Sequence, residues 1–416
     1  MSLTDRAAAA RAPTSGKGGP TGGRDDLRIF LVAGEHSGDA LGGKLMHALN
    51  ARCKGRIHYL GVGGEQMEAA GLASQFPLSD VAVMGPLSIL PRLPRIISRV
   101  HRTVDAAVAA EPDAVVIIDA PEFTHPIAKR IRKRAPSIPI IDYVSPSVWA
   151  WRPGRARKMR PYVDHVMGLL PFEPAAHQRL GGPPCTYVGH PLIEKVDWMH
   201  AVDAAGLAER LQLDPGRLTL VVLPGSRTSE VTRLMQPFGE ALELLQQRRV
   251  RPQVIIPVVP HVRPLVERHM QSWTVTPHLV EGEEDKFAAF RLAHAALAAS
   301  GTVTLELALA GTPMVVAYKV DGIAARLRFL LNVQSVVLAN LVLGENAFPE
   351  LLQEDCTPVK LADALELLLR ETPERQAQVT ALARIPHKML IEGSSPSAEA
   401  ANIVLDYAVN GLRPGR

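Results

Sequence analysis

The stretch AVVIIDAPEF, residues 114–123, decides the fold class of this 416-residue chain. Its first five residues are all apolar, and an apolar run that does not alternate with polar residues indicates a strand covered on both faces, as in a parallel sheet. The run stops on a carboxylate, Asp119, which would stand at the carboxyl end of that strand. Because ligands of open α/β sheets bind at such strand ends, Asp119 is a candidate active-site residue.

Apolar runs of the same kind recur along the chain, each followed by a helical segment. In the first half they are LRIFLVA, RIHYLGV, AVVIIDA and IPIIDYV, and after Leu213 they are RLTLVVL, QVIIPVV, HAALAAS and TPMVVAYK. This alternation predicts an α/β fold with two Rossmann-like, doubly wound domains that face a central cleft. We expect a disordered tail at residues 1–26, the first domain at 27–190, the second at 191–395 and a C-terminal helix at 396–416.

The composition is that of a soluble globular protein, with 47% hydrophobic and 21% charged residues. Three cysteines, Cys53, Cys185 and Cys356, lie far apart and near no histidine at metal-ligand spacing, so the sequence indicates neither a disulfide framework nor a zinc site. It contains no HExxH motif and no D-x-D pair, so we expect no metal. Because no apolar run reaches the roughly 18 residues of a membrane span, we expect a cytoplasmic protein.

The net charge of +4 is unevenly distributed along the chain. Residues 84–170 contain 14 Lys and Arg against 7 Asp and Glu, a local net charge of +7. Within MGPLSILPRLPRIISRVHR, residues 84–102, apolar side chains stand among arginines, as in segments that lie on an anionic lipid surface. The alternative is a core helix with a solvated basic face. The candidate membrane residues are Ile89, Leu90, Arg92, Leu93, Arg95, Ile96, Ile97 and Arg99.

A second basic segment, YVSPSVWAWRPGRARKMR at residues 143–160, combines tryptophans with cations. Trp149 and Trp151 precede the cations instead of being spaced among them as stacking platforms for nucleic acid. We therefore favour an anionic lipid surface over nucleic acid as its partner. The cations are Arg152, Arg155, Arg157, Lys158 and Arg160.

The stretch VVLPGSRTSEV predicts a diphosphate site in the second half. A buried strand ends at Pro224 and Gly225, and a helix begins after Arg227. Backbone N–H groups, the Ser226 hydroxyl and a permanently charged guanidinium would converge where a diphosphate can bind. The alternative is an ordinary surface arginine in a loop.

The stretch HAALAASGTVTLE repeats this arrangement with Ser300, Gly301 and Thr302 at a helix start. Glu306 follows one turn into the helix, where a carboxylate can accept hydrogen bonds from both ribose hydroxyls of a nucleotide. The alternative for Glu306 is an ion pair with a cation such as Lys319.

The stretch LVAGEHSGDALGG places Glu35, Ser37 and Asp39 at the start of the first helix. Backbone N–H groups there can meet an anion or sugar hydroxyls, whereas the alternative is helix capping by Ser37 or Asp39. In the same domain, a partly desolvated Asp119 at its strand end can accept a proton from an attacking hydroxyl. The alternative for Asp119 is a helix cap or turn former, and Glu122 is a rival base.

Eight motifs together resemble those of the bacterial lipid-A-disaccharide synthases, from about Leu27 to the C-terminus. They are GEHSGD, IDAPEF, YVSPSVWAW, LLPFE, VGHP, LPGSR, ASGTVTLE and MVVAYK. The resemblance implies a two-domain GT-B fold and a metal-independent, inverting transfer of 2,3-diacylglucosamine from its UDP derivative to 2,3-diacylglucosamine 1-phosphate, with UDP as product. It implies no further cofactor, a location at the inner face of the inner membrane, and a dimer that exchanges C-terminal segments.

The same resemblance implies roles for individual residues. Asp119 resembles the proposed base and Arg227 the diphosphate ligand, while Glu306 and the loop at 300–302 resemble the nucleoside end of the donor site. Asn340 resembles a further donor contact. Glu35 and Ser37 resemble acceptor-side residues.

Two rival functions follow from the same residues. One is another UDP-sugar enzyme on this fold, such as the transferase that acts on lipid-linked muropeptide or a UDP-N-acetylglucosamine 2-epimerase. The apolar and arginine-rich segment at 87–102 argues against a wholly soluble epimerase. The other is a non-catalytic module that docks on membranes or senses nucleotides.

Overall fold

The computed structural model describes residues 26–53, 55–82, 93–319 and 335–411. The tail expected at residues 1–26 lies outside these ranges except for Asp26, which begins the first strand.

The first half of the chain forms a seven-stranded sheet in which every strand pair is parallel. The strand order is β3-β2-β1-β4-β5-β6-β7. The order reverses between β1 and β4, so the carboxyl ends of these two strands form the switch point where ligands bind in such sheets. The strands are β1 (Asp26–Ala33), β2 (Arg56–Val62), β3 (Ala73–Ser74), β4 (Ala114–Ile118), β5 (Ile140–Tyr143), β6 (His165–Gly168) and β7 (Cys185–Tyr187).

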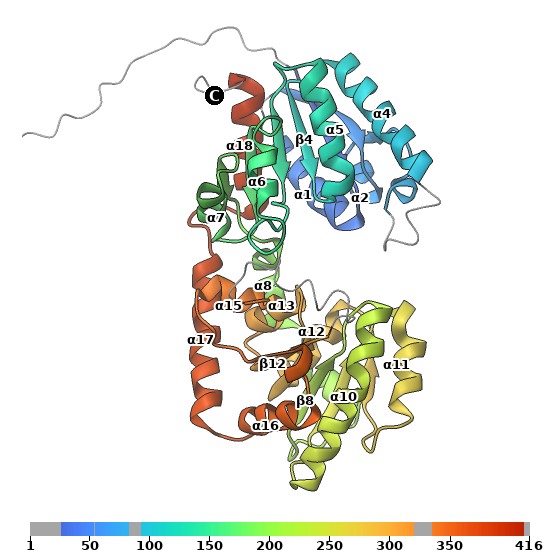
Figure 1. The fold of residues 1–416 in the computed structure, drawn as a ribbon, viewed down its shortest axis with the longest axis vertical. Helices are drawn as coiled ribbons and strands as arrows, with labels where there is room; N and C mark the ends of the chain where they lie inside the picture. Colours follow the sequence, from blue (N-terminus) through green and yellow to red (C-terminus); the bar gives the residue numbers. More distant parts are fainter. Residues whose placement is uncertain (1–25, 54, 83–92, 320–334, 412–416) are drawn as a thin grey trace, which may run out of the picture.

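Helices cover both faces of this sheet (Figure 1). Successive residues of β1 enter two different cores, with Ile29 and Leu31 on one face and Phe30 and Val32 on the other. This explains why the run is apolar at every position. The helices are α1 (His36–Arg52), α2 (Glu65–Ala69), α4 (Leu93–Ala110), α5 (Pro121–Arg134), α6 (Gly154–Met159) and α7 (Glu173–Leu180), with a 3₁₀ turn at Leu78–Asp80.

The second half forms a six-stranded parallel sheet of order β10-β9-β8-β11-β12-β13. Its order reverses between β8 and β11. The strands are β8 (Thr219–Leu223), β9 (Gln253–Pro257), β10 (His278–Val280), β11 (Ala295–Ala299), β12 (Met314–Tyr318) and β13 (Glu350–Leu352). Two separate apolar cores lie on its two faces, so the prediction of an α/β fold with two doubly wound domains is confirmed.

The helices of the second half surround this sheet (Figure 1). They are α8 (Val196–Ala201), α9 (Ala204–Arg210), α10 (Thr228–Gln247), α11 (Arg263–Met270), α12 (Glu283–Leu292), α13 (Val303–Ala310), α15 (Leu338–Leu343), α16 (Pro358–Leu369) and α17 (Pro373–Met389). Short 3₁₀ turns span Pro191–Lys195, Pro260–Val262 and Gln353–Asp355.

The chain crosses between the two halves twice, because α18 (Pro396–Asn410) returns to the first domain and packs against α1. The two crossing segments are in contact at Gly189 and Ile391. A Cβ added to Gly189, whose φ is +87°, would lie 2.7 Å from Ile391 Cδ1. Glu194 joins them, because its carboxylate accepts hydrogen bonds from Lys44 Nζ on α1 (2.5 Å) and from Ser397 Oγ on α18 (3.2 Å). In this structure α18 packs on its own chain, and a dimer that exchanges C-terminal segments stays a prediction.

Candidate active site

Asp119 lies directly after β4, at the switch point of the first sheet. Asp119 and Ala120 both have left-handed backbone angles, with φ of +53° and +43°. For residues with a side chain this conformation costs of order 1–3 kcal/mol each, and such strain gathers at functional sites. The turn is held by hydrogen bonds from the Asp119 N–H to the Tyr143 carbonyl (3.0 Å) and from Thr124 Oγ1 to the Asp119 carbonyl (2.8 Å).

The Asp119 carboxylate accepts two hydrogen bonds. Ser37 Oγ at the start of α1 donates to Oδ2 over 2.9 Å, and the Ala120 N–H donates to Oδ1 over 2.8 Å. The bond from the Ala120 N–H stabilises the turn after β4. Asp119 therefore also acts as a turn former, the alternative given for it from the sequence. The bond from Ser37 Oγ brings together two residues that the motifs GEHSGD and IDAPEF contribute separately.

Two glycines permit the close approach of these loops. A Cβ on Gly34 would lie 2.5 Å from Ala120 Cβ, and a Cβ on Gly38 would lie 3.0 Å from the Ile118 carbonyl oxygen. Asp39 does not cap α1; its buried carboxylate accepts from three backbone N–H groups at the start of α2, those of Gly64, Gln66 and Met67. The glycines of GEHSGD are therefore required by packing between loops.

Glu35 connects the first domain to the second. Partial burial and the Asp119 charge raise the pKa of the Glu35 carboxyl, whereas the positive charges of Arg227 and His36 lower this pKa. Arg227 belongs to the loop after β8. Trp149 after β5 and Phe172 after β6 pack against the core of the second domain, so the carboxyl edge of the first sheet faces that domain.

Glu230 holds the predicted diphosphate loop in its conformation. The sequence predicted the loop but not this role of Glu230. Its buried carboxylate accepts hydrogen bonds from the N–H groups of Ser226 (3.1 Å) and Arg227 (3.2 Å) and from Arg227 Nη1 (3.1 Å). Gly225, with φ of +107°, is required here because a Cβ would lie 2.4 Å from Glu230 Oε2. The Arg227 side chain remains 71% exposed. An acid three residues after the N-cap residue indicates a capping box. The motif was not recognised in the sequence because an arginine, and not Ser or Thr, stands at the N-cap position.

The second donor loop follows β11, at the other strand of the second switch point. Ser300 Oγ donates to the Val336 carbonyl over 2.8 Å, and Gly301 and Thr302 are exposed beside it. Glu306 pairs with Lys286 Nζ, at 3.0 and 2.9 Å from its two oxygens, and not with Lys319. Glu306 thus forms an ion pair, the alternative considered from the sequence, with a lysine of α12. A contact between Glu306 and a nucleotide stays a prediction.

Asn340 lies inside the second domain with its amide fully engaged. Its side chain is buried, with Nδ2 donating to the Phe348 carbonyl (3.0 Å) and to Glu350 Oε1 (2.8 Å), while Oδ1 accepts from the Phe348 N–H (2.9 Å). A direct contact with the donor would require these bonds to be exchanged. That contact stays a prediction.

A buried polar cluster behind Asp119 was also missed by the sequence analysis. His125 on α5 has Nδ1 3.0 Å from the Tyr162 hydroxyl and Nε2 3.3 Å from Asp142 Oδ2 on β5. Burial raises the pKa of the Asp142 carboxyl, the neighbouring His125 lowers it, and the Asp119 charge raises it. No sequence signal pairs a helix histidine with an aspartate in the next strand, because the contact exists only after folding.

A second buried acid, Glu173, begins α7 and accepts hydrogen bonds from the Leu170 N–H (3.0 Å) and from Trp149 Nε1 (3.2 Å). Burial raises the pKa of its carboxyl to about 7, although these donors oppose the shift. Trp149, which the sequence offered as part of a lipid surface, therefore packs inward and contacts the Phe172 ring edge-on.

The described part of the predicted membrane segment is α4. Leu93 and Ile97 are 43% and 48% exposed, whereas Ile96 packs against the core of the first domain. Arg99 donates two hydrogen bonds to Asp80, at 3.0 and 2.7 Å, and Arg95 Nη1 lies 3.6 Å from the same carboxylate. Ile89, Leu90 and Arg92 lie outside the described residues. Exposed apolar side chains and cations thus coexist on α4, and its contact with a membrane stays a prediction.

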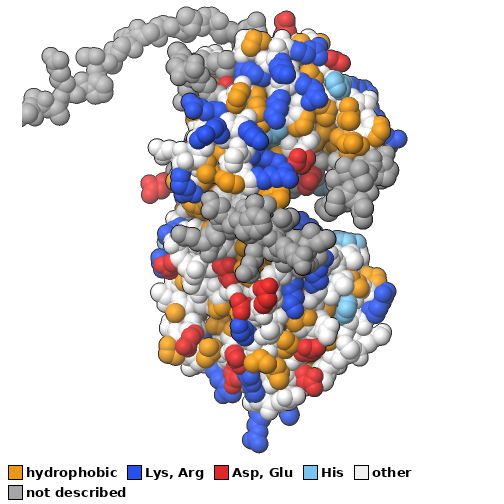
Figure 2. Space-filling model, viewed as in Figure 1, with side chains coloured by type: hydrophobic (Ala, Val, Ile, Leu, Met, Phe, Trp, Pro, Cys, Tyr) orange, Lys and Arg blue, Asp and Glu red, His pale blue; other side chains and the backbone are white. Residues whose placement is uncertain are grey.

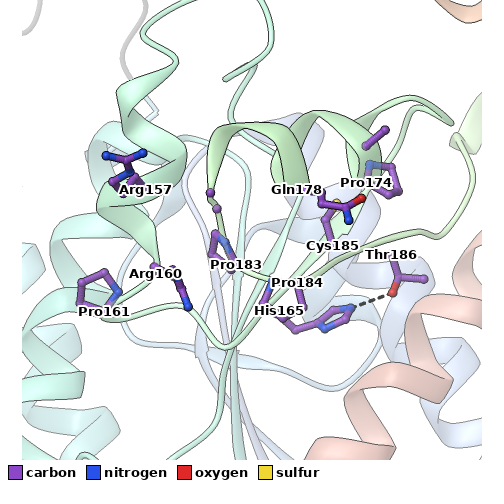
Figure 3. A pocket seen from close by; sticks show the side chains of 13 residues that line it. Arg157, Arg160, Pro161, His165, Pro174, Gln178, Pro183, Pro184, Cys185 and Thr186 are labelled. Atoms are coloured by element: carbon purple, nitrogen blue, oxygen red, sulfur yellow. Dashed lines mark hydrogen bonds between the residues drawn. The ribbon is translucent and has the colours of Figure 1, made fainter. Parts of the chain in front are cut away.

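Basic side chains also gather over α5 and α6 of the first domain (Figure 2). A cavity of about 1140 Å³ lies beside α6 and is lined by Arg157, Arg160, Gln178 and Thr186 among others (Figure 3). It opens where Pro161 and Pro184 lead into β6 and β7, at the amino edge of the sheet and away from Asp119.

The described residues contain no group of three or more His, Cys, Asp or Glu side chains arranged to hold a metal ion. Within the same residues, no helix combines the length and apolar character that crossing a bilayer demands.

Solved structures of other proteins share this architecture. The UDP-GlcNAc 2-epimerase from Neisseria meningitidis bound to UDP-GlcNAc superposes with a TM-score of 0.63 at 12% identity, covering 92% of this chain and 100% of that one. A glycosyltransferase from Rickettsia africae gives a TM-score of 0.56 at 9% identity, covering 93% and 99%. Two facing doubly wound domains, with an acid at one switch point and an arginine at the other, thus define a protein of the GT-B type.

Sequence comparison identifies the family. The lipid-A-disaccharide synthetase family model matches residues 29–404. The chain is 51% identical over 387 residues to the lipid-A-disaccharide synthase of Nitrobacter hamburgensis, covering 93% of this chain and 97% of the relative. It is 50% identical over 379 residues to that of Rhodopseudomonas palustris, covering 91% and 95%. The chain belongs to the lipid-A-disaccharide synthase family, and it is a glycosyltransferase of lipid A biosynthesis.

Proposed function

We propose that this enzyme transfers 2,3-diacylglucosamine from its UDP derivative to the 6-hydroxyl of 2,3-diacylglucosamine 1-phosphate, with inversion at the anomeric carbon and release of UDP. The observation that carries the proposal is the placement of Asp119 at the switch point of the first sheet and of Arg227 at the start of α10, beside the switch point of the second sheet. An acceptor bound at Asp119 and a donor diphosphate bound at Arg227 would then meet.

The proposed reaction assigns one task to each domain. The Asp119 carboxylate accepts the proton of the 6-hydroxyl, and the acceptor oxygen forms a bond to the anomeric carbon of the donor. The bond from that carbon to UDP breaks on the opposite face, and its electron pair leaves with the β-phosphate. Arg227 and the positive N-terminal end of α10 stabilise this developing charge.

Because the second domain supplies this positive charge, the proposed reaction needs no metal ion. The loop after β11 and Glu306 would hold the uridine end of the donor, and Glu35 and Ser37 would hold the acceptor. No cofactor other than the UDP of the donor takes part.

We also propose that the enzyme acts as a peripheral protein at the inner face of the inner membrane. The support is α4, which exposes Leu93 and Ile97 beside Arg95. An apolar side chain that inserts below lipid headgroups gains about 25 cal/mol per Å² of buried surface, and nearby arginines add about 1 kcal/mol each on an anionic leaflet. Flotation with phosphatidylglycerol vesicles tests this, and the double variant Leu93→Ser, Ile97→Ser should lose most of the bound fraction.

The direct test of function is product identification. Purified protein is incubated with UDP-2,3-diacylglucosamine and 2,3-diacylglucosamine 1-phosphate in the presence of EDTA, and the lipid product is identified by mass and its linkage by NMR. We expect a β-1,6 disaccharide 1-phosphate and one UDP per product. Turnover of unacylated UDP-N-acetylglucosamine to its 2-epimer, or UDP binding without any transfer, would instead support the rival functions.

Variants test the assigned base. Asp119→Asn should lower kcat by about 10²–10⁴-fold, the usual contribution of general base catalysis. Asp363→Asn is the matched control, because Asp363 is an exposed acid of α16 that pairs with Arg248 on the second domain. Near-normal turnover by a folded Asp119→Asn protein would refute the assignment.

A further inference from the structure

The carboxyl edge of the first sheet gathers backbone strain beyond Asp119. Eight described residues other than glycine have left-handed backbone angles, and four lie in the loops at this edge: Asp119 and Ala120 after β4, and Val144 and Arg152 after β5. Strained conformations persist where the surrounding structure enforces them, and they cluster at ligand sites. The backbone strain at Val144 and Arg152 therefore indicates that the loop after β5 has a functional role.

In the loop after β5, an arginine stacks on an exposed aromatic ring. Trp151 is 41% exposed, and the Arg152 guanidinium lies over its ring, with Cζ 4.5 Å from the centroid. Stacking fixes the plane of the guanidinium and leaves its N–H groups free to point outward along that plane. Such a fixed guanidinium is suited to an anion with several oxygens, and an aromatic ring is suited to the apolar face of a sugar.

A second arginine reaches the same place from α6. Arg155 Nη2 donates to Glu122 Oε1 over 2.5 Å, and Arg152 Nη1 lies 3.9 Å from the same oxygen. Arg155 holds the pKa of the Glu122 carboxyl below its usual range, and Arg152 adds to this effect. Glu122 itself is 79% exposed, so two guanidiniums share one carboxylate that solvent already surrounds.

The position of Glu122 links this cluster to the reaction site. Glu122 stands in the first turn of α5, three residues after Asp119. Arg155 also lowers the pKa of the buried Asp142 carboxyl, which in turn senses the Asp119 charge. Because both arginines lie beside Glu122 Oε1, they stand on the acceptor side of the site, next to the first turn of the helix that follows Asp119.

We propose that Arg152 and Arg155, with the Trp151 ring, bind the phosphate of a sugar 1-phosphate acceptor, and that Glu122 holds the two arginines in place until the phosphate displaces it. This inference rests on the proposed function. In a glucosamine ring, carbons 1 and 5 flank the ring oxygen, so the 1-phosphate lies within one ring of the 6-hydroxyl. A 6-hydroxyl at Asp119 thus brings the phosphate to the neighbourhood of Glu122.

The energies favour the exchange. In the ion pair of Glu122 with Arg155 the carboxylate is 79% exposed although the arginine side chain is only 20% exposed, so water screens the pair and its contribution is about 1 kcal/mol. A phosphate offers up to two charges and three acceptor oxygens, and hydrogen bonds to charged groups contribute about 1.5–3 kcal/mol each. Each arginine should therefore be worth about 10-fold to 100-fold in acceptor affinity.

The experiment compares two acceptors that differ only in the phosphate: 2,3-diacylglucosamine 1-phosphate and the methyl glycoside of 2,3-diacylglucosamine. For Arg152→Ala and Arg155→Ala we expect kcat/KM for the phosphorylated acceptor to fall about 10-fold to 100-fold, mainly through KM. The values for the methyl glycoside and the KM for UDP-diacylglucosamine should stay within about 2-fold of wild type. Arg152→Lys should recover part of the loss, because it restores charge without the planar fork.

Arg157→Ala is the matched control. Arg157 belongs to the same helix as Arg155 but lines the cavity at the amino edge of the sheet (Figure 3). The Arg157→Ala substitution removes the same positive charge from α6 but leaves the proposed phosphate site unchanged. An equal loss in the Arg157 variant, or equal losses for both acceptors in the Arg152 and Arg155 variants, would overturn the proposal.

Glu122→Gln gives a change in the opposite direction. Without the competing charge, the KM for the phosphorylated acceptor should fall about 2-fold to 5-fold, because an exposed ion pair contributes up to about 1 kcal/mol. The methyl glycoside should show no such gain. A higher KM for the phosphorylated acceptor alone would show that Glu122 contributes to its binding and would overturn the displacement step.

Equilibrium binding separates this inference from the proposed function. If wild-type protein transfers no sugar, binding of 2,3-diacylglucosamine 1-phosphate in mixed micelles is measured by tryptophan fluorescence and calorimetry. Binding that weakens in the Arg152 and Arg155 variants would retain the phosphate site while the proposed function fails. Turnover by wild type with no preference for the phosphorylated acceptor would retain the function and reject the phosphate site, and the absence of binding would reject both.

Discussion

Ser37 Oγ donates a hydrogen bond to Asp119 Oδ2 over 2.9 Å, although 82 residues separate the two in the sequence. The bond joins the start of α1 to the end of β4, the two elements that border the switch point of the first sheet. It also orients one carboxylate oxygen, while the Ala120 N–H binds the other. Asp119 is therefore fixed in direction as well as in position.

Ser37→Ala removes this orienting hydroxyl. Because hydrogen bonds to charged groups contribute about 1.5–3 kcal/mol, we expect kcat to fall about 10-fold to 100-fold while thermal stability changes little. Ser37→Thr keeps the hydroxyl and is the control. Steady-state kinetics at saturating acceptor measures the effect, and an unchanged kcat in Ser37→Ala would show that the hydrogen bond has no role in the reaction.

Gly34→Ala should disturb the same junction through packing. The added Cβ would lie 2.5 Å from Ala120 Cβ, so the loop after β4 must shift. We expect a loss of about 1–3 kcal/mol in the free energy of unfolding, as in other overpacked sites, together with a reduced kcat. In Gly154→Ala, where no atom beyond the neighbouring residues and the backbone of its own helix lies within 4 Å of the new Cβ, denaturant unfolding should reveal no loss.

Glu173 makes stability depend on pH. Its folded-state pKa of about 7 lies above the ordinary value of 4.5 for a glutamate, so the folded protein binds the proton more tightly than the unfolded chain. Stability should therefore fall as pH rises from about 4.5 to about 7, by up to about 3 kcal/mol at 1.36 kcal/mol per pKa unit. Urea unfolding at pH 5 and pH 8 measures this.

The control for this prediction is Glu173→Gln, which cannot ionise but can still accept from Trp149. Its stability relative to wild type should increase between pH 5 and pH 8. A parallel pH dependence of the two proteins would assign the titration to another group.

The buried pair of His125 and Asp142 predicts strong coupling between α5 and β5. Asp142→Leu or His125→Leu alone leaves the polar atoms of the partner buried without their neighbour, which typically costs about 1–3 kcal/mol. The double variant should recover much of that loss. A double-mutant cycle on unfolding free energies measures the coupling, and additive losses would mean that the 3.3 Å contact between Nε2 and Oδ2 contributes nothing.

The sequence predicted the residues that stand at strand ends, because those positions follow directly from local patterns. Asp119, Arg227 and the loop at 300–302 all follow apolar runs, and parallel strands bring their carboxyl ends to one edge. The fold class followed from the same runs. These features depend only on neighbours in the chain.

The partners of those residues could not be predicted in the same way. Glu230, Lys286 and the pair of His125 and Asp142 act through contacts that arise from packing. The family resemblance, and no local pattern, assigned Asn340 to the donor site; the hydrogen bonds of its amide to Phe348 and Glu350 arise from folding, and the donor contact stays a prediction. Asp39 looked like a cap for its own helix and instead caps the next one.

The return of α18 means that the first domain is not an autonomous unit of the polypeptide. Ala400, Ala401, Val404 and Tyr407 complete the core in which Ile29 and Leu31 are buried. A fragment ending near residue 190 would leave that core open to water, so it should aggregate, whereas a fusion of residues 396–411 to its end should restore solubility. Synthesis by the ribosome must therefore pass Tyr407 before the face of this sheet that contains Ile29 and Leu31 is fully covered.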